Sequence, residues 1–373
     1  MEAGSLLIRR GGCAVNVAVR RYGATSDVLG RSKDMNARRL TLLVLAALAL
    51  APAAAWAQDT AVYPLERPTQ VRELDGTVVY SAFDPAIDGY RLTVRDAQGA
   101  GTVPVQPSET PFEADIGTNS SGDPQVIFSL DVGPQEGGVS GMRDLFVLTL
   151  GSGEVRPVRN ANTGLDERSP TIEGGRIAFS RGFDEGENPV VYTKRLVAPR
   201  ERPSTRLSGV PQRRDGRSTT DRSVSELELE DGLLGQIVTY TYDTAGGFRT
   251  NEVRQVELDE RSSRQVATLT TGLNGQFFVG LSFAEDYLAW YETSNIGNSS
   301  AGAYRYQPGR AYRFAEAPPY LSGFAWTGDG TWQARASFDQ ECDDPSTDDA
   351  VEECTLVRTG DLAWETIEAD RVR

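Results

Sequence analysis

The stretch Ile177-Ala178-Phe179-Ser180, a short apolar run that ends in an aromatic residue and a serine, decides the fold of this chain because it recurs. The related stretches are Val78-Val79-Tyr80-Ser81, Val126-Ile127-Phe128-Ser129, Ile237-Val238-Thr239-Tyr240 and Leu288-Ala289-Trp290-Tyr291. Successive aromatic residues are 48, 51, 61 and 50 residues apart, and Trp332-Gln333-Ala334-Arg335-Ala336 is a degraded sixth copy. A repeat of about 50 residues is typical of the four-stranded blades of a β-propeller.

Each copy is flanked by further strand candidates. An alternating segment such as Glu226-Leu227-Glu228-Leu229 precedes the apolar run, and another such as Val253-Arg254-Gln255-Val256 follows it. Turn pairs often separate the first two strands: Asp75-Gly76, Gly174-Gly175, Asp231-Gly232 and Asp329-Gly330. Because radial packing buries the faces of such sheets, we predict an all-β, six-bladed β-propeller of four-stranded antiparallel blades over residues 69–373.

This repeat pattern does not determine how the ring closes. Six complete units leave the segment Thr60-Ala61-Val62-Tyr63-Pro64-Leu65 without a place. It pairs with an outer strand near Leu362-Ala363-Trp364, or it trails from the domain. A seventh blade and an open ring are further alternatives.

Two stretches resemble a known family. Ser169-Pro170-Thr171-Ile172-Glu173-Gly174-Gly175 followed by Arg176-Ile177-Ala178-Phe179-Ser180, and the turn Ala325-Trp326-Thr327-Gly328-Asp329-Gly330, look like the WD40-like repeat of TolB-type propellers. Asp144-Leu145-Phe146-Val147 is similar to the Asp-Ile-Tyr-like strand of that repeat. No copy has the family's full Ser-Pro-Asp-Gly turn, and Arg335 stands where blade six should have its aromatic residue. The resemblance therefore implies the propeller fold more than any family activity.

The N-terminal region contains an internal export signal. A basic start at Met35 is followed by an uncharged apolar run from Leu40 to Leu50, and Ala55-Trp56-Ala57 has the small residues of a cleavage site. We predict a signal peptide over residues 35–57, cleaved between Ala57 and Gln58, with residues 58–68 as an N-terminal segment. Residues 1–34 would then be a disordered extension from a mis-assigned start, and a membrane anchor is the alternative to cleavage. The protein is expected to be secreted or periplasmic, with no stable membrane anchor after cleavage.

Charge and composition exclude several functions. The full chain has 38 Lys and Arg, 53 Asp and Glu and no His, which gives a net charge of −15. Removal of residues 1–57 leaves 316 residues with 30 basic and 50 acidic side chains, a net charge of −20. Such a charge argues against a nucleic-acid partner, and the absence of His excludes Ser-His-Asp and Cys-His catalysis.

Two irregular segments are candidate sites. An arginine-rich stretch includes Arg213, Arg214 and Arg217 and is either an anion-binding loop or, as we prefer, a solvated linker. The acidic segment Phe338 to Glu353 is a candidate Ca²⁺ loop, but it lacks the EF-hand spacing. We prefer a hairpin closed by a disulfide between Cys342 and Cys354. No cofactor is expected, with Ca²⁺ as the alternative.

These observations favour a binding protein over an enzyme. No pair of carboxylates stands out by position, and no Gly-x-Ser-x-Gly nucleophile elbow is present. We expect an exported, monomeric and non-catalytic propeller that binds a protein, a peptide or an envelope polymer. The alternative is a propeller glycoside hydrolase or lyase that uses carboxylates at a channel mouth.

The leader can be tested on the native protein. A signal peptide must stand at the N-terminus to be recognised, which places the start at Met35. Cleavage after Ala57 then makes Gln58 the first residue of the purified protein in N-terminal sequencing. Peptides from residues 1–34 in mass spectra of that protein would contradict both the start at Met35 and the cleavage.

Overall fold

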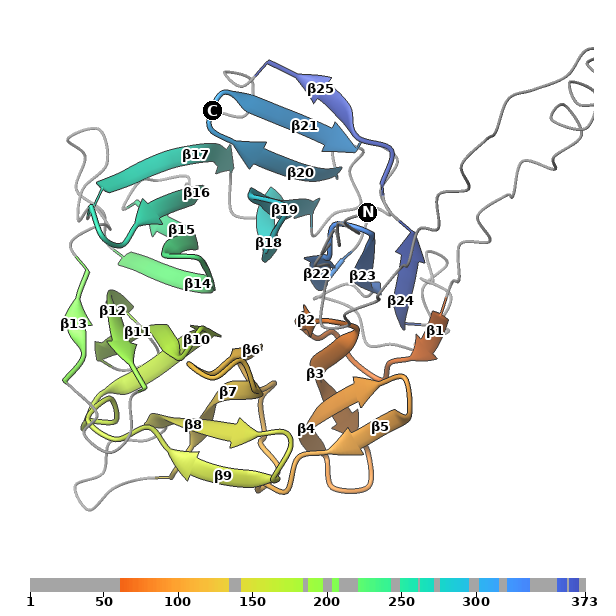
Figure 1. Ribbon diagram of the computed structural model, residues 1–373, viewed down its shortest axis with the longest axis vertical. Coiled ribbons are helices and arrows are strands. Elements are labelled where there is room, and N and C mark those ends of the chain that lie inside the picture. The colour runs from red at the N-terminus through yellow and green to blue at the C-terminus, as the bar shows by residue number, and fades with distance from the viewer. Residues whose placement is uncertain are drawn as a thin grey trace, which may run out of the picture. The chain divides into compact units, whose positions relative to one another are not determined.

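The computed structural model describes residues 61–133, 142–183, 187–196, 203–207, 221–242, 249–260, 262–271, 276–294, 302–314, 321–335, 354–360 and 362–368. All of them belong to one unit, Gln58–Arg373. Within it, antiparallel hydrogen bonds join the strands into six sheets, which Figure 1 shows around a central axis. The predicted six-bladed, all-β propeller with four-stranded antiparallel blades is confirmed. The predicted signal peptide lies outside the described residues.

The first three blades follow the chain from the axis outward. Blade one is β2 (Val71–Leu74), β3 (Thr77–Asp84), β4 (Gly89–Asp96) and β5 (Gly99–Thr102). Blade two is β6 (Ala114–Thr118), β7 (Pro124–Asp131), β8 (Arg143–Thr149) and β9 (Glu154–Pro157). Blade three is β10 (Asp166–Glu173), β11 (Arg176–Phe183), β12 (Glu187–Arg195) and β13 (Thr205–Arg206).

The last three blades include both ends of the described chain. Blade four is β14 (Asp221–Glu230), β15 (Leu233–Thr241), β16 (Arg249–Glu257) and β17 (Ser262–Thr271). Blade five is β18 (Gln276–Ala284), β19 (Tyr287–Ser294), β20 (Gly302–Gln307), β21 (Arg310–Phe314) and β25 (Glu365–Ile367). Blade six is β22 (Gly323–Trp326), β23 (Gly330–Arg335), β24 (Thr355–Gly360) and β1 (Ala61–Pro64).

The recurring apolar run is the second strand of each blade, which is covered on both faces. In β15, Ile237 contacts the cluster shared with blade five, while Val238 contacts the cluster shared with blade three. A strand that is buried on both sides reads as a continuous apolar run rather than as an alternating one. The marker that predicted the repeat therefore reports the position of this strand between two neighbouring blades.

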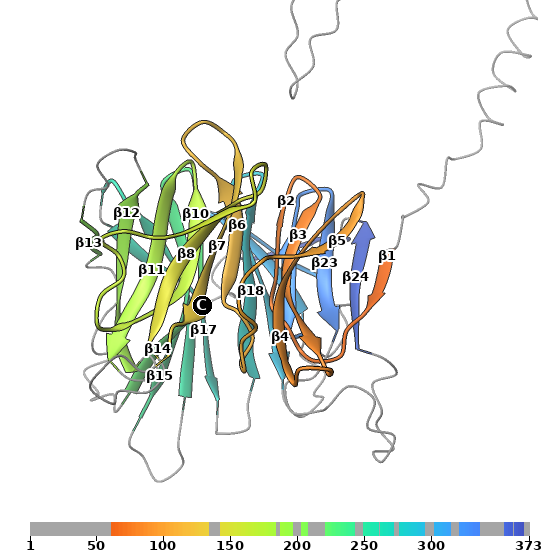
Figure 2. The ribbon, with the colours of Figure 1, turned by 90° about the horizontal axis from the view of Figure 1, so that it is seen from below.

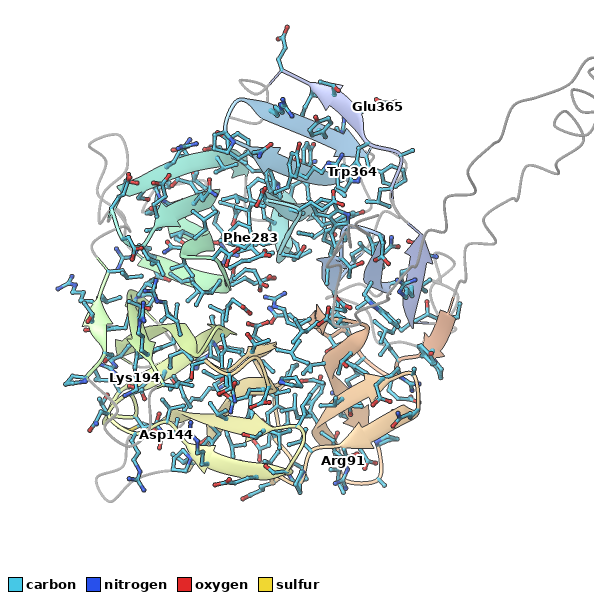
Figure 3. The ribbon with its side chains drawn as sticks, viewed as in Figure 1. Arg91, Asp144, Lys194, Phe283, Trp364 and Glu365 are labelled. Atoms are coloured by element: carbon cyan, nitrogen blue, oxygen red, sulfur yellow. The ribbon has the colours of Figure 1, made fainter. Side chains whose placement is uncertain are left out.

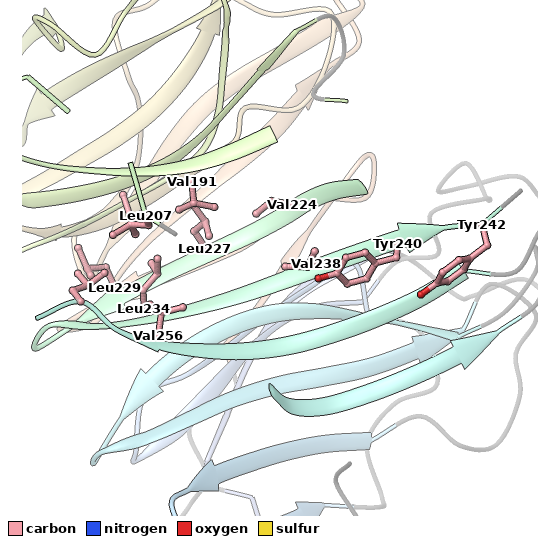
Figure 4. Packing of buried hydrophobic residues seen from close by; sticks show 12 residues of the cluster. Val191, Leu207, Val224, Leu227, Leu229, Leu234, Val238, Tyr240, Tyr242 and Val256 are labelled. Atoms are coloured by element: carbon pink, nitrogen blue, oxygen red, sulfur yellow. The ribbon is translucent and has the colours of Figure 1, made fainter. Parts of the chain in front are cut away.

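Six buried apolar clusters hold the ring together, one at each junction between neighbouring blades. Figure 4 shows the cluster between blades three and four, in which Val191 and Leu207 face Leu227 and Leu229. Close approach near the axis requires glycine at some positions. A Cβ atom on Gly117 would lie 1.8 Å from the carbonyl oxygen of Ile172 in the next blade. Neighbouring inner strands therefore contact each other through their backbones.

The ring is closed by the N-terminal strand. β1 pairs antiparallel with β24, in the register Val62 to Val357 and Tyr63 to Leu356. The Leu65 amide extends this pairing by donating to the Cys354 carbonyl oxygen at 2.8 Å. The suggested partner near Leu362 to Trp364 is therefore wrong, because blade six needs β1 as its fourth strand. A trailing segment is excluded for the same reason.

The C-terminal strand takes an unexpected place. β25 pairs with β21 and so becomes a fifth strand at the outer edge of blade five. Residues near Leu362 thus leave blade six instead of completing it, and they contact the core between blades five and six. The first and last described strands, β1 and β25, are consequently both paired at edges of sheets.

Deletion of residues 58–66 should destabilise the ring. The deletion removes β1 and the Leu65 side chain, whose loss alone costs about 2–4 kcal/mol. We expect the Tm measured by differential scanning calorimetry to fall by several degrees. Val62→Ala is the control, because Val62 is 56% exposed and should leave the Tm nearly unchanged. A deletion variant that melts with the wild type would show that β1 is not a closing strand.

Candidate functional site

A buried charge cluster lies at the axis and joins side chains from three blades. Arg72 of β2 is only 6% exposed, and its Nη2 lies 3.0 Å from Oε2 of Glu226 in β14. Its Nε lies 3.5 Å from Oε2 of Glu228 and 3.9 Å from Oδ1 of Asp115 in β6. One guanidinium therefore faces three carboxyl groups across the centre of the propeller.

The carboxyl groups of this cluster also bind backbone amides of other blades. Glu226 accepts hydrogen bonds from the amides of Gly280 and Leu281 in β18, at 2.9 and 3.0 Å. Asp115 Oδ2 accepts from Thr171 Oγ1 at 2.8 Å and from the Ile172 amide at 2.9 Å. Close to these carboxyl groups, three inner strands change register against the second strand of their blade. These strands are β10, β14 and β18. Side-chain carboxylates thus satisfy amides near positions where the ladder is interrupted.

Burial and charge shift the pKa values within this cluster. Burial opposes the charge of Arg72, yet the three carboxyl groups outweigh it and raise the pKa of its guanidinium. Burial, with Asp115 nearby, raises the pKa of Glu228 well above its ordinary value, and burial also raises the pKa of Asp115. A single guanidinium cannot neutralise three carboxylates. Glu228 is therefore the carboxyl group of this cluster that most readily keeps a proton.

A second charge cluster joins blades two and three near the N-terminal ends of β6, β8 and β10. Arg143 Nη1 lies 3.0 Å from Glu113 Oε1, and the Arg143 amide donates to Asp166 Oδ1 at 3.1 Å. Arg168 pairs with Asp166 and lies 3.7 Å from Glu113 Oε1. The Ser169 amide donates to Glu113 Oε2 at 2.5 Å. These charged side chains are engaged with one another.

The inner hairpin turns carry a group of carboxylates that we call the acidic rim. Its members come from all six blades: Glu73, Asp75, Asp123, Glu173, Glu230, Asp231, Glu285, Asp286 and Asp329. Figure 2 shows the turns of blades one, two and three at the same edge of the propeller. Some of the rim residues are present because the turns require them. Asp75-Gly76 and Asp231-Gly232 both have positive φ at the two central positions, as type I′ turns require.

Neighbouring blades bring the rim carboxylates within electrostatic reach of each other. Glu230 of blade four interacts with Glu173 of blade three and with Asp286 of blade five, and Glu73 interacts with Asp329 of blade six. Burial first, then the adjacent Asp231, and then Glu173 and Asp286 raise the pKa of Glu230 to about 7. Glu73, Glu173, Glu230 and Glu285 are not required by the turn geometry. The rim is thus more acidic than hairpin turns alone would make it.

Two arginines beside the rim are already paired. Arg176 lies 3.8 Å from Asp259, and Arg358 lies 3.5 Å from Asp329. Since Asp329 remains largely exposed, its pair with Arg358 is accessible to solvent. Arg195, the exposed ladder partner of Arg176, adds a third cation beside the rim. The nine rim carboxylates outnumber these three arginines.

Most of the residues predicted from the sequence as sites lie outside the described residues. These are Arg213, Arg214, Arg217, Cys342, Ala57, Gln58 and the acidic segment 338–353. Cys354 is described: it is 5% exposed and packs beside Leu356 and Trp332. Its disulfide with Cys342 stays a prediction, as does the arginine-rich anion site.

The axial residues were missed by the sequence analysis. The alternation of Glu226-Leu227-Glu228-Leu229 predicts a strand, but it also predicts that the glutamates face solvent. The sequence signal for an axial residue is a charged side chain inside the first strand of a blade, since that strand lies nearest the axis. In the described part of the chain no cluster of three or more metal-binding side chains occurs. No helix in this part could cross a membrane.

Comparisons with known proteins find solved structures of similar fold but no family for this chain. No family model matches the chain, and no curated protein matches it. A putative TolB from Agrobacterium tumefaciens matches with 9% identity over 53% of this chain and 63% of its own, with a TM-score of 0.35. The β-propeller domain of the Trilobed protease from Pyrococcus furiosus matches with 9% identity, 80% and 97% coverage and a TM-score of 0.42. The GH93 α-L-arabinofuranosidase of Fusarium graminearum matches with 8% identity, 84% and 99% coverage and a TM-score of 0.48.

These neighbours include a TolB-like protein as well as hydrolases, so they do not separate binding from catalysis. The chain spans less than two thirds of the TolB structure. At such low identities and TM-scores the matches carry no inference about activity. The propeller assignment rests on the strand pairing of the chain itself.

Arg72→Met should strongly destabilise the protein. The substitution leaves buried carboxyl groups without their cation, which costs about 3–5 kcal/mol in the free energy of unfolding. Arg91→Met is the matched control, because Arg91 pairs with Asp84 at 2.8 Å near the surface (Figure 3) and should cost less than about 1 kcal/mol. Urea unfolding of both variants measures the difference. Equal losses in the two variants would contradict the role of Arg72 as the axial ion.

Glu230 should make the stability pH-dependent. Its pKa is raised from 4.5 to about 7, so the native state keeps a proton that the unfolded state has lost. The stabilisation is complete below the unfolded pKa and is lost as the pH rises through the folded pKa. The Tm should therefore fall between pH 4.5 and pH 7, and Glu230→Gln should flatten that fall. Glu154→Gln, on an exposed position of β9, is the control and should leave the slope unchanged.

Proposed function

We propose that this chain is an exported, non-catalytic propeller that binds a positively charged segment of a protein or peptide at the acidic rim. The observation that carries the proposal is that inner hairpin turns of all six blades place carboxylates around one end of the axis. A ring of like charge attracts cationic segments over distances near the Debye length, about 8–10 Å. Cell export is part of this proposal and is supported by the leader pattern before Gln58.

Two of the three axial carboxyl groups, those of Glu226 and Asp115, support a binding role because their oxygens are engaged within the protein. Glu226 uses both oxygens for backbone amides and also pairs with Arg72. Asp115 binds Thr171 and the Ile172 amide. A glycosidase needs an acid and a second carboxylate that both reach the substrate. The axial cluster instead joins blades, whereas the rim presents exposed carboxylates such as Asp231, Glu285 and Asp286 to a partner.

A labelled oligolysine peptide tests the rim. We expect fluorescence anisotropy to show binding that weakens as salt rises from about 50 to 200 mM, since exposed charges are screened. Combined Glu173→Gln, Asp231→Asn and Asp286→Asn substitutions should weaken binding about tenfold or more, because the three carboxylates come from adjacent blades.

The control for this experiment has the same change in net charge. Glu66→Gln, Asp88→Asn and Glu109→Gln neutralise three exposed carboxylates outside the rim. This variant should bind the peptide almost as the wild type does. Equal weakening by the two triple variants would show a general charge effect and would remove the rim as a specific site.

One observation favours hydrolysis as the second candidate function. A carboxyl group with a pKa of about 7 beside other carboxylates has the properties of a general acid, and Glu230 fulfils this description. The proposed reaction is cleavage of a glycosidic bond, with Glu173 or Asp286 as the second carboxylate. Release of reducing sugar from cell-envelope polysaccharide that disappears in Glu230→Gln would support it. No release by the wild type would leave binding as the function.

A further inference from the structure

The C-terminal strap, residues 362–368, occupies the outer edge of blade five. Three pairs join β25 to β21: Ala311 to Ile367, Tyr312 to Thr366 and Arg313 to Glu365. In the described sheets of the other blades, the fourth strand is the last one. A sheet edge presents unpaired amides and carbonyls that template the addition of another strand. At blade five this position is filled from within the chain.

The strap is anchored ahead of its strand. β25 itself is short and largely exposed, whereas Leu362 is 9% exposed and packs against Trp326 and Leu321. The ring of Trp364 lies 5.5 Å from that of Trp326 at an interplanar angle of 67°. Figure 3 shows Trp364 and Glu365 where the chain passes onto blade five. Leu362 and Trp364 therefore fix the chain ahead of β25, while Ile367 of β25 packs against the cluster between blades four and five.

The aromatic anchor completes a cage around one guanidinium. Arg305 of β20 lies over four rings, 4.9 Å from Tyr287, 4.6 Å from Tyr312, 5.0 Å from Trp326 and 4.7 Å from Trp364. Within the described residues its buried Nε has no hydrogen-bond partner. Such a cation gains most from the faces of aromatic rings when it is shielded from water. Three of the four rings belong to the blades, and the strap supplies the fourth, that of Trp364.

We propose that the β21 edge and the Arg305 cage form a strand-acceptor site for an extended segment of a partner protein, which the strap occupies in its absence. The edge would supply backbone hydrogen bonds, and the cage would select an aromatic side chain just before the added strand. The partner segment therefore has the chemistry of the strap: an apolar residue, an aromatic residue two positions later, and then a short strand. This site is on the outer side of blade five and does not depend on the acidic rim.

Occupation from within the chain weakens the apparent affinity for a partner. When only a fraction of molecules has a free site, the apparent dissociation constant rises by the inverse of that fraction. Substitutions that loosen the anchor but leave β21 and Arg305 intact should therefore increase the affinity for a segment added in trans.

The probe is a labelled peptide with the sequence of residues 360–369, added to the full chain. The strap variant combines Leu362→Ala with Trp364→Ala. Ile87→Ala with Val132→Ala is the control, because these two apolar side chains are 41% and 40% exposed and lie outside blade five. We expect the strap variant to bind the peptide about tenfold or more tightly than the wild type and the control. The peptide with Ala in place of its Trp should bind much more weakly.

Circular dichroism and the Tm show whether the strap variant is folded, and hydrogen exchange of the β21 amides provides a second measurement. The amides should exchange faster in the variant and be protected again by the peptide. A folded variant that ignores the peptide, or that binds the peptide without its Trp equally well, would overturn the proposal. A concentration-dependent wild-type dimer that the peptide dissociates would also overturn it, because the occupant would be a second copy's strap.

Discussion

The structure depends on the burial of both faces of every blade. Each sheet has apolar side chains on its two sides, as Ile237 and Val238 show in blade four. Each face of such a sheet needs a neighbouring blade, because an uncovered face would expose a hydrophobic surface to water. Six blades solve the problem by forming a closed ring with one apolar cluster at each junction. The closing strand β1 follows from this requirement, since it completes the sheet at the last junction.

Radial packing creates an axis on which polar groups must be satisfied. The inner strands approach closely at Gly117 and have register shifts in three blades, so some amides there lack partners in the ladder. Asp115 and Glu226 supply the missing acceptors, and Arg72 balances part of their charge. Ion pairs buried in this way add little net stability over an apolar core, but they are costly to break. These contacts join the inner strands of blades one, two and four.

The first and last described strands both pair with an open sheet edge, but with different consequences. β1 and β25 both satisfy an open sheet edge, but β1 is required for closure while β25 adds to a blade that already has four strands. The rim and the strap site are therefore distinct surfaces. The first recognises charge through turn carboxylates, and the second would recognise backbone and an aromatic side chain through β21 and Arg305.

The sequence by itself determined the fold class, the number of blades and the inner turns, because burial on two faces and type I′ geometry leave local patterns such as Ile177 to Ser180 and Asp75-Gly76. Only the tertiary structure decided which ends pair and which charges meet. Arg72 and Glu226 are 154 residues apart, and no local pattern relates them. The same alternation that correctly marked the strand around Glu226 pointed its charge toward water, because period alone cannot distinguish solvent from a polar axis.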